Sequence, residues 1–167
     1  MTRWEKVDLR EHKQEIIIPS INIQEALTEH QIQLIYPVMR QLRTAFTDIN
    51  TFVFSVKRIQ QSGYRVYFAS CNQLLSSNAI GVIGLRLQED LCWGRHIYID
   101  DLVVDENFQN RGIGRQLMTF ARDLAISESC QCLRLASGLE KYNAHGFYDH
   151  IGYKRTSYTF AYKISDS

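Results

Sequence analysis

Hydrophobic residues recur along the chain with two different periods, and the change of period separates predicted helices from predicted strands. The first part of the chain has the three- and four-residue spacing of helices. Thr28 is a good N-cap for a first helix, in which Pro37 would cause a bend or a split. Asp48 or Asn50 would cap a second helix that ends near Gly63. The sequence therefore predicts two helices before any central strand.

The middle of the chain is rich in β-branched and aromatic residues, which favour strands. Residues 64–70 and 79–87 have this composition, and the turn-like segment 72–78 between them predicts an antiparallel hairpin. A second turn at residues 90–94 leads into residues 95–104, whose last part is apolar on both faces. A strand that is apolar on both faces belongs in the centre of a sheet.

The helical spacing returns at Gly112, and the two periods then alternate to the end of the chain. We expect a helix from Gly112, a strand over 132–137, a short helix over 142–151 and a final strand over 153–164. The predicted order is two helices, three strands, a helix, a strand, a helix and a strand. This order is typical of a single α/β domain.

The size and composition of the chain fit one globular domain that covers residues 1–167. Hydrophobic residues make up 45% of the sequence, and no linker or internal repeat divides it. Residues 1–24 are expected to form an extended N-terminal arm. The net charge of +1 disfavours a nucleic-acid partner, because phosphate backbones are recognised by strongly basic surfaces.

The apolar runs of the chain are shorter than the roughly 20 residues that a membrane-spanning helix needs. The charged N-terminal segment has no apolar stretch behind it, so a secretory signal is not expected. We therefore predict a cytoplasmic protein with no membrane partner. The cysteines show no CxxC pair and no histidines at zinc-finger spacing, so we expect reduced, packed thiols and no metal. They are Cys71, Cys92, Cys130 and Cys132.

The segment with the clearest chemical character lies between the predicted central strand and the helix that follows it. It consists of Gln109, Asn110, Arg111, Gly112, Ile113 and Gly114, and Arg115 comes next. Its two glycines permit positive φ angles and a close approach of the backbone, while the start of a helix favours an anion. The segment therefore predicts a pyrophosphate site, although the same glycines could serve only to start the helix tightly. A dinucleotide fingerprint would need a third glycine, and a P-loop would need a Gly-Lys-Ser/Thr ending.

Two motifs together resemble the GNAT superfamily of N-acetyltransferases over residues 64–164. The first is Gln109-x-x-Gly112-x-Gly114 after the strand Asp101–Val104, and the second is Ala144-His145-x-Phe147-Tyr148-x-x-x-Gly152-Tyr153. The resemblance implies a mixed central sheet flanked by helices, with the fourth and fifth strands splayed apart around acetyl-CoA as the cosubstrate. It also implies that the pyrophosphate lies on residues 109–115 and that the pantetheine is held by backbone groups of Leu102, Val103 and Val104.

The second motif carries one departure from the family pattern and one implied catalytic role. Many family members have an asparagine three residues before the alanine, and this chain has Lys141 there. Asn143 is the nearby candidate for that pantetheine contact. The tyrosine of this motif commonly protonates the departing thiolate in the family, which implies that role for Tyr148. The alternative is that Tyr148 only packs its ring while its hydroxyl finds a partner.

The catalytic base is expected to be one of two adjacent aspartates. In a regular strand Asp100 and Asp101 would point to opposite faces, so only one of them would address an acceptor pocket. Residues 97–101 resemble the corresponding strand of spermidine/spermine N-acetyltransferases, where an acidic residue at the Asp100 position is taken as the base. The resemblance therefore favours Asp100. A purely structural role for either aspartate, or proton relay through water, is the alternative.

Taken together, these features predict an acetyl-CoA-dependent N-acetyltransferase. Direct transfer to a primary amine in a ternary complex is expected, because no cysteine lies in a motif typical of an acyl-enzyme. A non-catalytic acyl-CoA-binding sensor or interaction module is the alternative function, since it would keep the glycine segment without a base or an acid.

The acceptor is predicted only in outline, as an amine on a small molecule or a protein. Its wall is expected on the first helix, at Tyr36, Met39, Arg40 and Arg43. A group of acids mildly favours a cationic acceptor such as a polyamine, an aminoglycoside or a lysine side chain. These acids are Glu89, Asp90, Asp100 and Asp101. A second copy of the chain is a further candidate partner.

Overall fold

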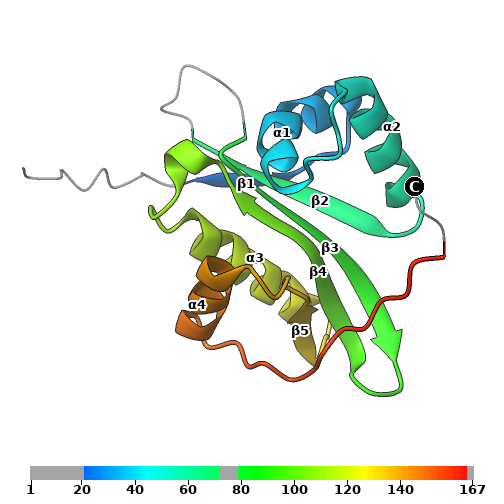
Figure 1. Cartoon of the computed structure of the whole chain (residues 1–167), viewed down its shortest axis with the longest axis vertical. Helices are drawn as coiled ribbons and strands as arrows, with labels where there is room; N and C mark the ends of the chain where they lie inside the picture. Colours follow the sequence, from blue (N-terminus) through cyan, green and yellow to red (C-terminus); the bar gives the residue numbers. More distant parts are fainter. Residues whose placement is uncertain (1–20, 72–78, 165–167) are drawn as a thin grey trace, which may run out of the picture.

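The computed structural model describes residues 21–71 and 79–164. These residues form a five-stranded mixed sheet with helices on both of its faces (Figure 1). The elements in chain order are β1 (Asn22–Glu25), α1 (Glu29–Leu42), α2 (Ile49–Gln60), β2 (Tyr64–Ser70), β3 (Gly81–Asp90), β4 (Gly94–Val104), the 3₁₀ turn η1 (Glu106–Phe108), α3 (Ile113–Ser127), β5 (Cys132–Leu135) and α4 (Tyr142–His150). The predicted α/β fold is confirmed.

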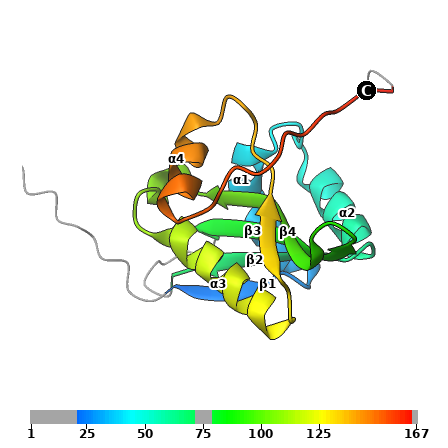
Figure 2. The same cartoon turned by 90° about the horizontal axis from the view of Figure 1, so that it is seen from below.

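The strands lie side by side in chain order, from β1 at one edge to β5 at the other. Neighbours from β1 to β4 are antiparallel, whereas β5 runs parallel to β4. One face of the sheet is covered by α1 and α2, and the other by α3 and α4 (Figures 1 and 2). Two separate apolar clusters result, one under each pair of helices.

The first two helices begin where the sequence predicts. Thr28 forms a capping box at the start of α1, and Asp48 accepts a hydrogen bond from a backbone N–H of α2. Pro37 does not split α1, which runs unbroken from Glu29 to Leu42. Val38 and Met39 are buried directly after the proline, so packing against the sheet holds the helix together where its local hydrogen bonding is weakened.

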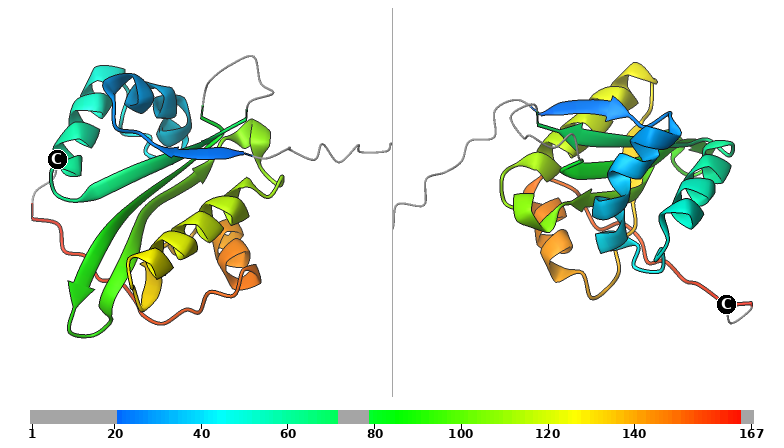
Figure 3. Two further views of the ribbon diagram at one scale, coloured as in Figure 1. Left: turned by 180° about the vertical axis from the view of Figure 1, so that it is seen from behind. Right: turned by 90° about the horizontal axis from the view of Figure 1, so that it is seen from above.

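The expected final strand over 153–164 is absent, because the described residues after Gly152 contain no regular secondary structure. This segment leaves the sheet and extends away from the helices and strands (Figures 2 and 3). Its large side chains alternate as in a strand but are 83–94% exposed, namely Tyr158, Phe160, Tyr162 and Ile164. The period of two describes how side chains alternate in an extended chain, but a strand also needs a neighbour for its backbone hydrogen bonds.

The last residues of the predicted N-terminal arm, residues 1–24, belong to a strand of the sheet instead. Residues 1–20 lie outside the described residues, but residues 22–25 form β1, which pairs antiparallel with Ser70–Tyr67 of β2. This strand is short, polar and at the edge of the sheet, so it lacks the apolar alternation by which a half-buried strand is recognised in a sequence. In the described part of the chain, no helix is long and apolar enough to cross a membrane.

Candidate active site

The alternation of side chains along β4 changes at Asp100. In the pairing of β4 with β3, Gly84 lies opposite Asp101 and Leu85 lies opposite Ile99, so Asp100 is an extra residue. Such a β-bulge shifts the side chains that follow it to the other face of the sheet. Ile99 accordingly belongs to the cluster under α3, whereas Asp101 faces the side of α1 and α2.

A pocket of about 200 Å³ lies between the first two helices and the sheet. The side facing the helices is mostly apolar, and the side facing the strands carries polar and charged groups. The lining residues are Met39, Arg43, Phe46, Phe52, Ser55, Val56, Ile59, Tyr64, Arg86, Asp100 and Asp101. The pocket can therefore hold a small molecule with both apolar and polar parts.

Two expectations about this pocket change with the structure. The expectation that only one aspartate can address the pocket is wrong, because the bulge turns both Asp100 and Asp101 toward it. Of the four residues expected at the acceptor wall, two lie at this pocket. Met39 and Arg43 line the pocket, whereas Tyr36 packs its ring against Phe52 at a centroid distance of 5.3 Å instead. Arg40 is exposed outside the lining, with its guanidinium over the Tyr36 ring.

Asp101 is almost completely buried, and both of its carboxylate oxygens are bound. The Tyr64 hydroxyl donates to Oδ2 at 2.6 Å, and the Arg43 Nε donates to Oδ1 at 2.7 Å. Arg43 also donates through Nη2 to the backbone carbonyl of Asp100 at 2.9 Å, so one guanidinium ties the end of α1 to the bulge. Burial and the neighbouring Asp101 carboxylate raise the pKa of Tyr64 well above its ordinary value. Tyr64 therefore stays protonated and serves as a donor.

Asp100 has a different environment. It accepts one hydrogen bond, from Arg86 Nε at 2.9 Å, and its side chain is 25% exposed. Burial raises the pKa of the Asp100 carboxyl, and the charge of Arg86 opposes this rise. Asp100 is therefore a better proton acceptor than an ordinary surface aspartate, and it retains access to the pocket.

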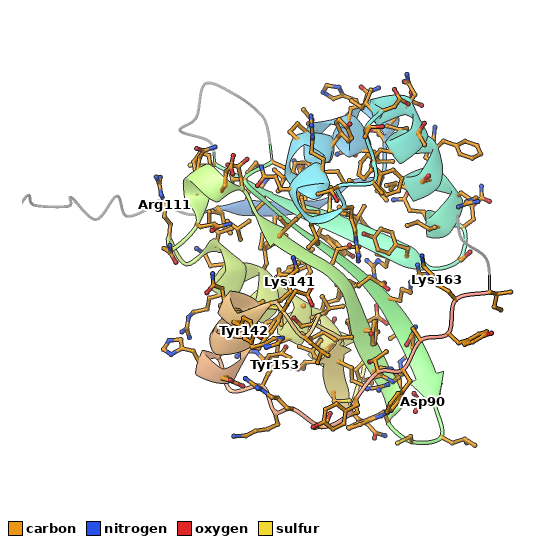
Figure 4. The ribbon with its side chains drawn as sticks, in the orientation of Figure 1. Asp90, Arg111, Lys141, Tyr142, Tyr153 and Lys163 are labelled. Carbon is orange, nitrogen blue, oxygen red and sulfur yellow. The ribbon has the colours of Figure 1, made fainter. Side chains whose placement is uncertain are left out.

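The four acids that favoured a cationic acceptor do not form one group around the pocket. Glu89 and Asp90 end β3, and Asp90 lies at the turn of the β3–β4 hairpin (Figure 4). The Asp90 carboxylate accepts hydrogen bonds from the backbone N–H groups of Cys92 and Trp93, at 2.9 and 2.6 Å. Asp90 is therefore a turn residue, and only Asp100 and Asp101 remain at the pocket.

The start of α3 is built differently from the starts of α1 and α2. Its N-cap is Gly112 with a φ of 77°, and no side chain caps it. The backbone N–H groups of residues 110–115 donate no hydrogen bond to any group of the described residues. Arg111 and Arg115 are exposed there, and Arg111 stands over the Phe108 ring at 5.2 Å (Figure 4). Unpaired N–H groups together with cationic side chains make this helix start suitable for a phosphate group.

The two glycines of this segment have different roles. Gly112 has the positive φ that the sequence allowed. Asn110, for which none was predicted, also has a positive φ, of 59°. Gly114 lies inside the helix without a left-handed φ, and a Cβ there would come within 3.3 Å of the Phe147 ring. Gly114 therefore allows α3 and α4 to approach closely.

The end of β4 leads directly to this helix start. Pairing of β4 with β5 stops at Ile99 and Leu135, so Leu102, Val103 and Val104 extend beyond β5 and pair only with β3. The Gln109 amide donates to the Val104 carbonyl at 3.3 Å and so fixes the turn between strand and helix. The edge of residues 102–104 that faces away from β3 is therefore without a partner strand in the described part of the chain.

Tyr148 lies in α4, between the rings of Phe147 and Tyr153 at centroid distances of 5.4 and 5.9 Å. Its hydroxyl makes no hydrogen bond within the described residues, and burial raises its pKa. The hydroxyl is therefore protonated at neutral pH. Asn143, in the first turn of the same helix, is exposed, and Lys141 provides no side-chain cap for α4.

Comparison with known proteins decides the family. The model of the acetyltransferase (GNAT) family matches residues 36–153. The chain belongs to the GNAT acetyltransferase family. It is 32% identical over 127 residues to YhdJ of Bacillus subtilis, described as an uncharacterized N-acetyltransferase, with 75% of this chain and 86% of YhdJ covered. It is 30% identical over 88 residues to an aminoalkylphosphonate N-acetyltransferase of Salmonella typhimurium, with 52% of this chain and 57% of that enzyme covered.

Solved structures show the same fold. The aminoglycoside N-acetyltransferase AAC(6')-Iy, bound to a bisubstrate analogue of coenzyme A, superposes with a TM-score of 0.73 over 89% of this chain and 100% of that chain, at 14% identity. Glucosamine-6-phosphate N-acetyltransferase from Arabidopsis thaliana gives a TM-score of 0.70 over 88% and 100% of the two chains, at 17% identity. The predicted GNAT fold and acyltransferase class are confirmed.

The sequence did not predict the two strand residues that bind the pocket aspartates, or the glycine beside them, as site residues. Tyr64 and Arg86 come from β2 and β3, and each binds an aspartate of β4. Gly84 leaves the space that the Tyr64 side chain occupies, because a Cβ on Gly84 would overlap that side chain. A glycine inside an otherwise apolar strand pattern is a known signal of a bulge or of close packing, and Gly84 carries that signal.

The packing at Gly84 gives a test of this arrangement. We expect Gly84→Ala to destabilise the protein by about 1–3 kcal/mol, because the added methyl group displaces Tyr64 from Asp101. Urea unfolding measures the change. Gly146→Ala is the matched control, since a Cβ at Gly146 meets open space in α4 and should leave stability unchanged or raise it. Equal stability of the two variants would contradict the close approach of Tyr64 to Gly84.

Proposed function

We propose that this GNAT protein transfers the acetyl group of acetyl-CoA directly to a primary amine in a ternary complex. The row of unpaired backbone N–H groups at residues 110–115 carries the proposal, because these donors suit an anionic ligand. The row begins just after β4, and the Asp100 bulge lies in the same strand. A single strand thus connects the proposed cosubstrate site with the pocket.

The residues of the α3 start fit the pyrophosphate of coenzyme A. We assign this group to the backbone of Gln109–Gly114, with Arg111 and Arg115 as cationic donors. The pantetheine would lie along Leu102, Val103 and Val104, where β4 extends beyond β5. This arrangement supports the expected divergence of the fourth and fifth strands around the cosubstrate. Asn143 remains the proposed additional contact from α4.

Charge reversal at the α3 start tests the cosubstrate site. Arg115→Glu should leave the fold intact because Arg115 is exposed, but it places a carboxylate beside the bound phosphates. We expect coenzyme A affinity, measured by calorimetry, to fall by about 10-fold or more. Arg122→Glu is the control on the same helix, where Arg122 is 62% exposed and two turns further along, and its affinity should stay within about 2-fold. Equal affinities for both variants would remove the phosphate assignment.

Acetyl transfer to an ammonium requires three proton movements. The acceptor ammonium must lose a proton before its nitrogen attacks the thioester carbonyl, the nitrogen loses a second proton as the C–N bond forms, and the thiolate gains one as the C–S bond breaks. We assign acceptance of the first proton to the Asp100 carboxylate and donation to the thiolate to the Tyr148 hydroxyl; the second nitrogen proton passes to solvent, which reprotonates Tyr148. The raised pKa values of both groups support these roles, since a stronger base and a protonated acid are needed. None of the pocket residues among the described segments is a cysteine, which favours direct transfer.

Removing one hydroxyl tests the proposed acid. Tyr148→Phe should lower kcat on the order of 10-fold or more while leaving the affinity for coenzyme A almost unchanged. Tyr153→Phe is the control, because its ring packs beside that of Tyr148 but has no assigned proton. Steady-state rates of both variants are compared with wild type. Full activity in Tyr148→Phe would leave this residue with a packing role alone.

The two aspartates are distinguished by pH dependence and by stability. Asp100→Asn should lose activity at neutral pH and recover as the pH approaches the pKa of the amine, about 10 for a lysine-like acceptor, because the solution then deprotonates it. Asp101→Asn should instead lose about 1–3 kcal/mol of stability, because the buried Asp101 binds both Arg43 and Tyr64. Rate–pH profiles and urea unfolding measure these effects. Alkaline recovery in Asp101→Asn alone would reverse the assignment.

A further inference from the structure

The pocket is electrically neutral as a whole. Its lining carries two carboxylates, Asp100 and Asp101, and two guanidiniums, Arg43 and Arg86. Each carboxylate lies within 2.9 Å of a guanidinium nitrogen, so the charges are matched in pairs. A polycation such as a polyamine would gain no net attraction here and would meet two fixed positive groups. The pocket therefore does not favour a polyamine, which is one of the cationic acceptors that the sequence allowed.

The hydrogen-bonding groups left free in the pocket indicate what the acceptor contains. Both Asp101 oxygens are occupied, whereas Asp100 Oδ1 has no partner within the described residues. Arg86 uses Nε for Asp100 and has only a long contact, at 3.4 Å, from Nη1 to the Ser62 carbonyl. Arg43 leaves Nη1 without a partner in the described part of the chain. The free charged groups are thus one carboxylate oxygen and the outer N–H groups of two guanidiniums.

We propose that the acceptor is a primary amine that also carries an anionic oxygen group, such as a carboxylate, phosphonate or phosphate. This inference rests on the proposed transferase function and specifies its substrate class. The amine would lie at Asp100, and the anionic group would bind Arg86, with Arg43 beside it. The ligand's two charges then replace the ion pair between Asp100 and Arg86, so neither side chain is left without a counter-charge.

Two further observations favour Arg86 as the main anion partner. Its guanidinium is held over the Tyr64 ring at 5.3 Å, so its orientation is fixed before a ligand binds. Its side chain is 26% exposed, against 49% for Arg43, so a hydrogen bond to it is less screened by water. Met39, Phe46 and Val56 line the same pocket, and their apolar surface suits a short aliphatic link between the two ligand charges.

Matched pairs of amines test the proposal. We would compare 2-aminoethylphosphonate, O-phosphoethanolamine and 4-aminobutyrate with propylamine and butylamine, and include spermidine, all at the same neutral pH. The amines with an anionic group should have values of kcat/KM roughly 10- to 100-fold higher, as expected for a charge-assisted hydrogen bond. The separate phosphonate, phosphate and carboxylate arms show which anion fits best.

A variant of Arg86 tests whether this residue causes the preference for amines with an anionic group. Arg86→Gln should raise KM for the amines with an anionic group and reduce their advantage over butylamine, measured as the ratio of kcat/KM values within the same variant, to about 3-fold or less. The ratio is used because loss of Arg86 also removes the partner of Asp100 and so affects the rate with every amine. Arg134→Gln is the control, because Arg134 pairs with Asp90 near the β3–β4 hairpin and does not line the pocket. Equal use of anionic and neutral amines by the wild type, or a preference for spermidine, would overturn the inference.

Binding measurements separate this inference from the proposed function. If no amine is acetylated but 2-aminoethylphosphonate still raises Tm in wild type and not in Arg86→Gln, the ligand class stands and the transferase proposal fails. If the protein acetylates amines but Arg86→Gln retains the full preference for anionic ones, the transferase proposal stands and this inference fails. Absence of any Arg86-dependent binding also overturns it.

Discussion

The burial of one charged group, the Asp101 carboxylate, constrains the centre of this molecule. Its side chain is 7% exposed, and a buried charge without partners would cost several kcal/mol. Three elements meet that requirement. Tyr64 of β2 and Arg43 after α1 supply the donors, and Gly84 of β3 leaves the space through which Tyr64 reaches β4. These contacts hold the β4 bulge and the first helix in a fixed relation.

The bulge in turn decides what each face of β4 presents. Before it, Ile97 and Ile99 pack against the cluster under α3, and after it Leu102 and Val104 do so. Asp100 and Asp101 lie between these pairs and face the opposite side, where α1 and α2 close the pocket. One irregular residue therefore allows a single strand to serve two sites. This explains why the proposed acceptor pocket and the proposed cosubstrate site can lie close together without sharing side chains.

The start of α3 differs from the starts of α1 and α2 in how its backbone N–H groups are satisfied. Thr28 and Asp48 satisfy backbone donors at α1 and α2, and these helix starts need no ligand. At α3 a glycine stands at the cap position, and the donors of residues 110–115 have no partner within the described segments. A helix start without a side-chain cap is less stable, and an anion bound beside the two arginines would offset that loss.

The sequence by itself determined the helices, four of the five described strands and the position of the glycine segment, because these features depend on local periodicity, caps and turn residues. It could not determine whether residues 153–164 pair with a neighbouring strand, since alternation does not specify a partner. It also placed Asp100 and Asp101 on opposite faces, and that was wrong, because a bulge is set by the partner strand. Only the tertiary structure brought Tyr64, Arg86 and Arg43 to these two aspartates. Residues 14 to 58 positions apart in the chain meet there because the sheet and α1 pack together, and no local pattern records such a contact.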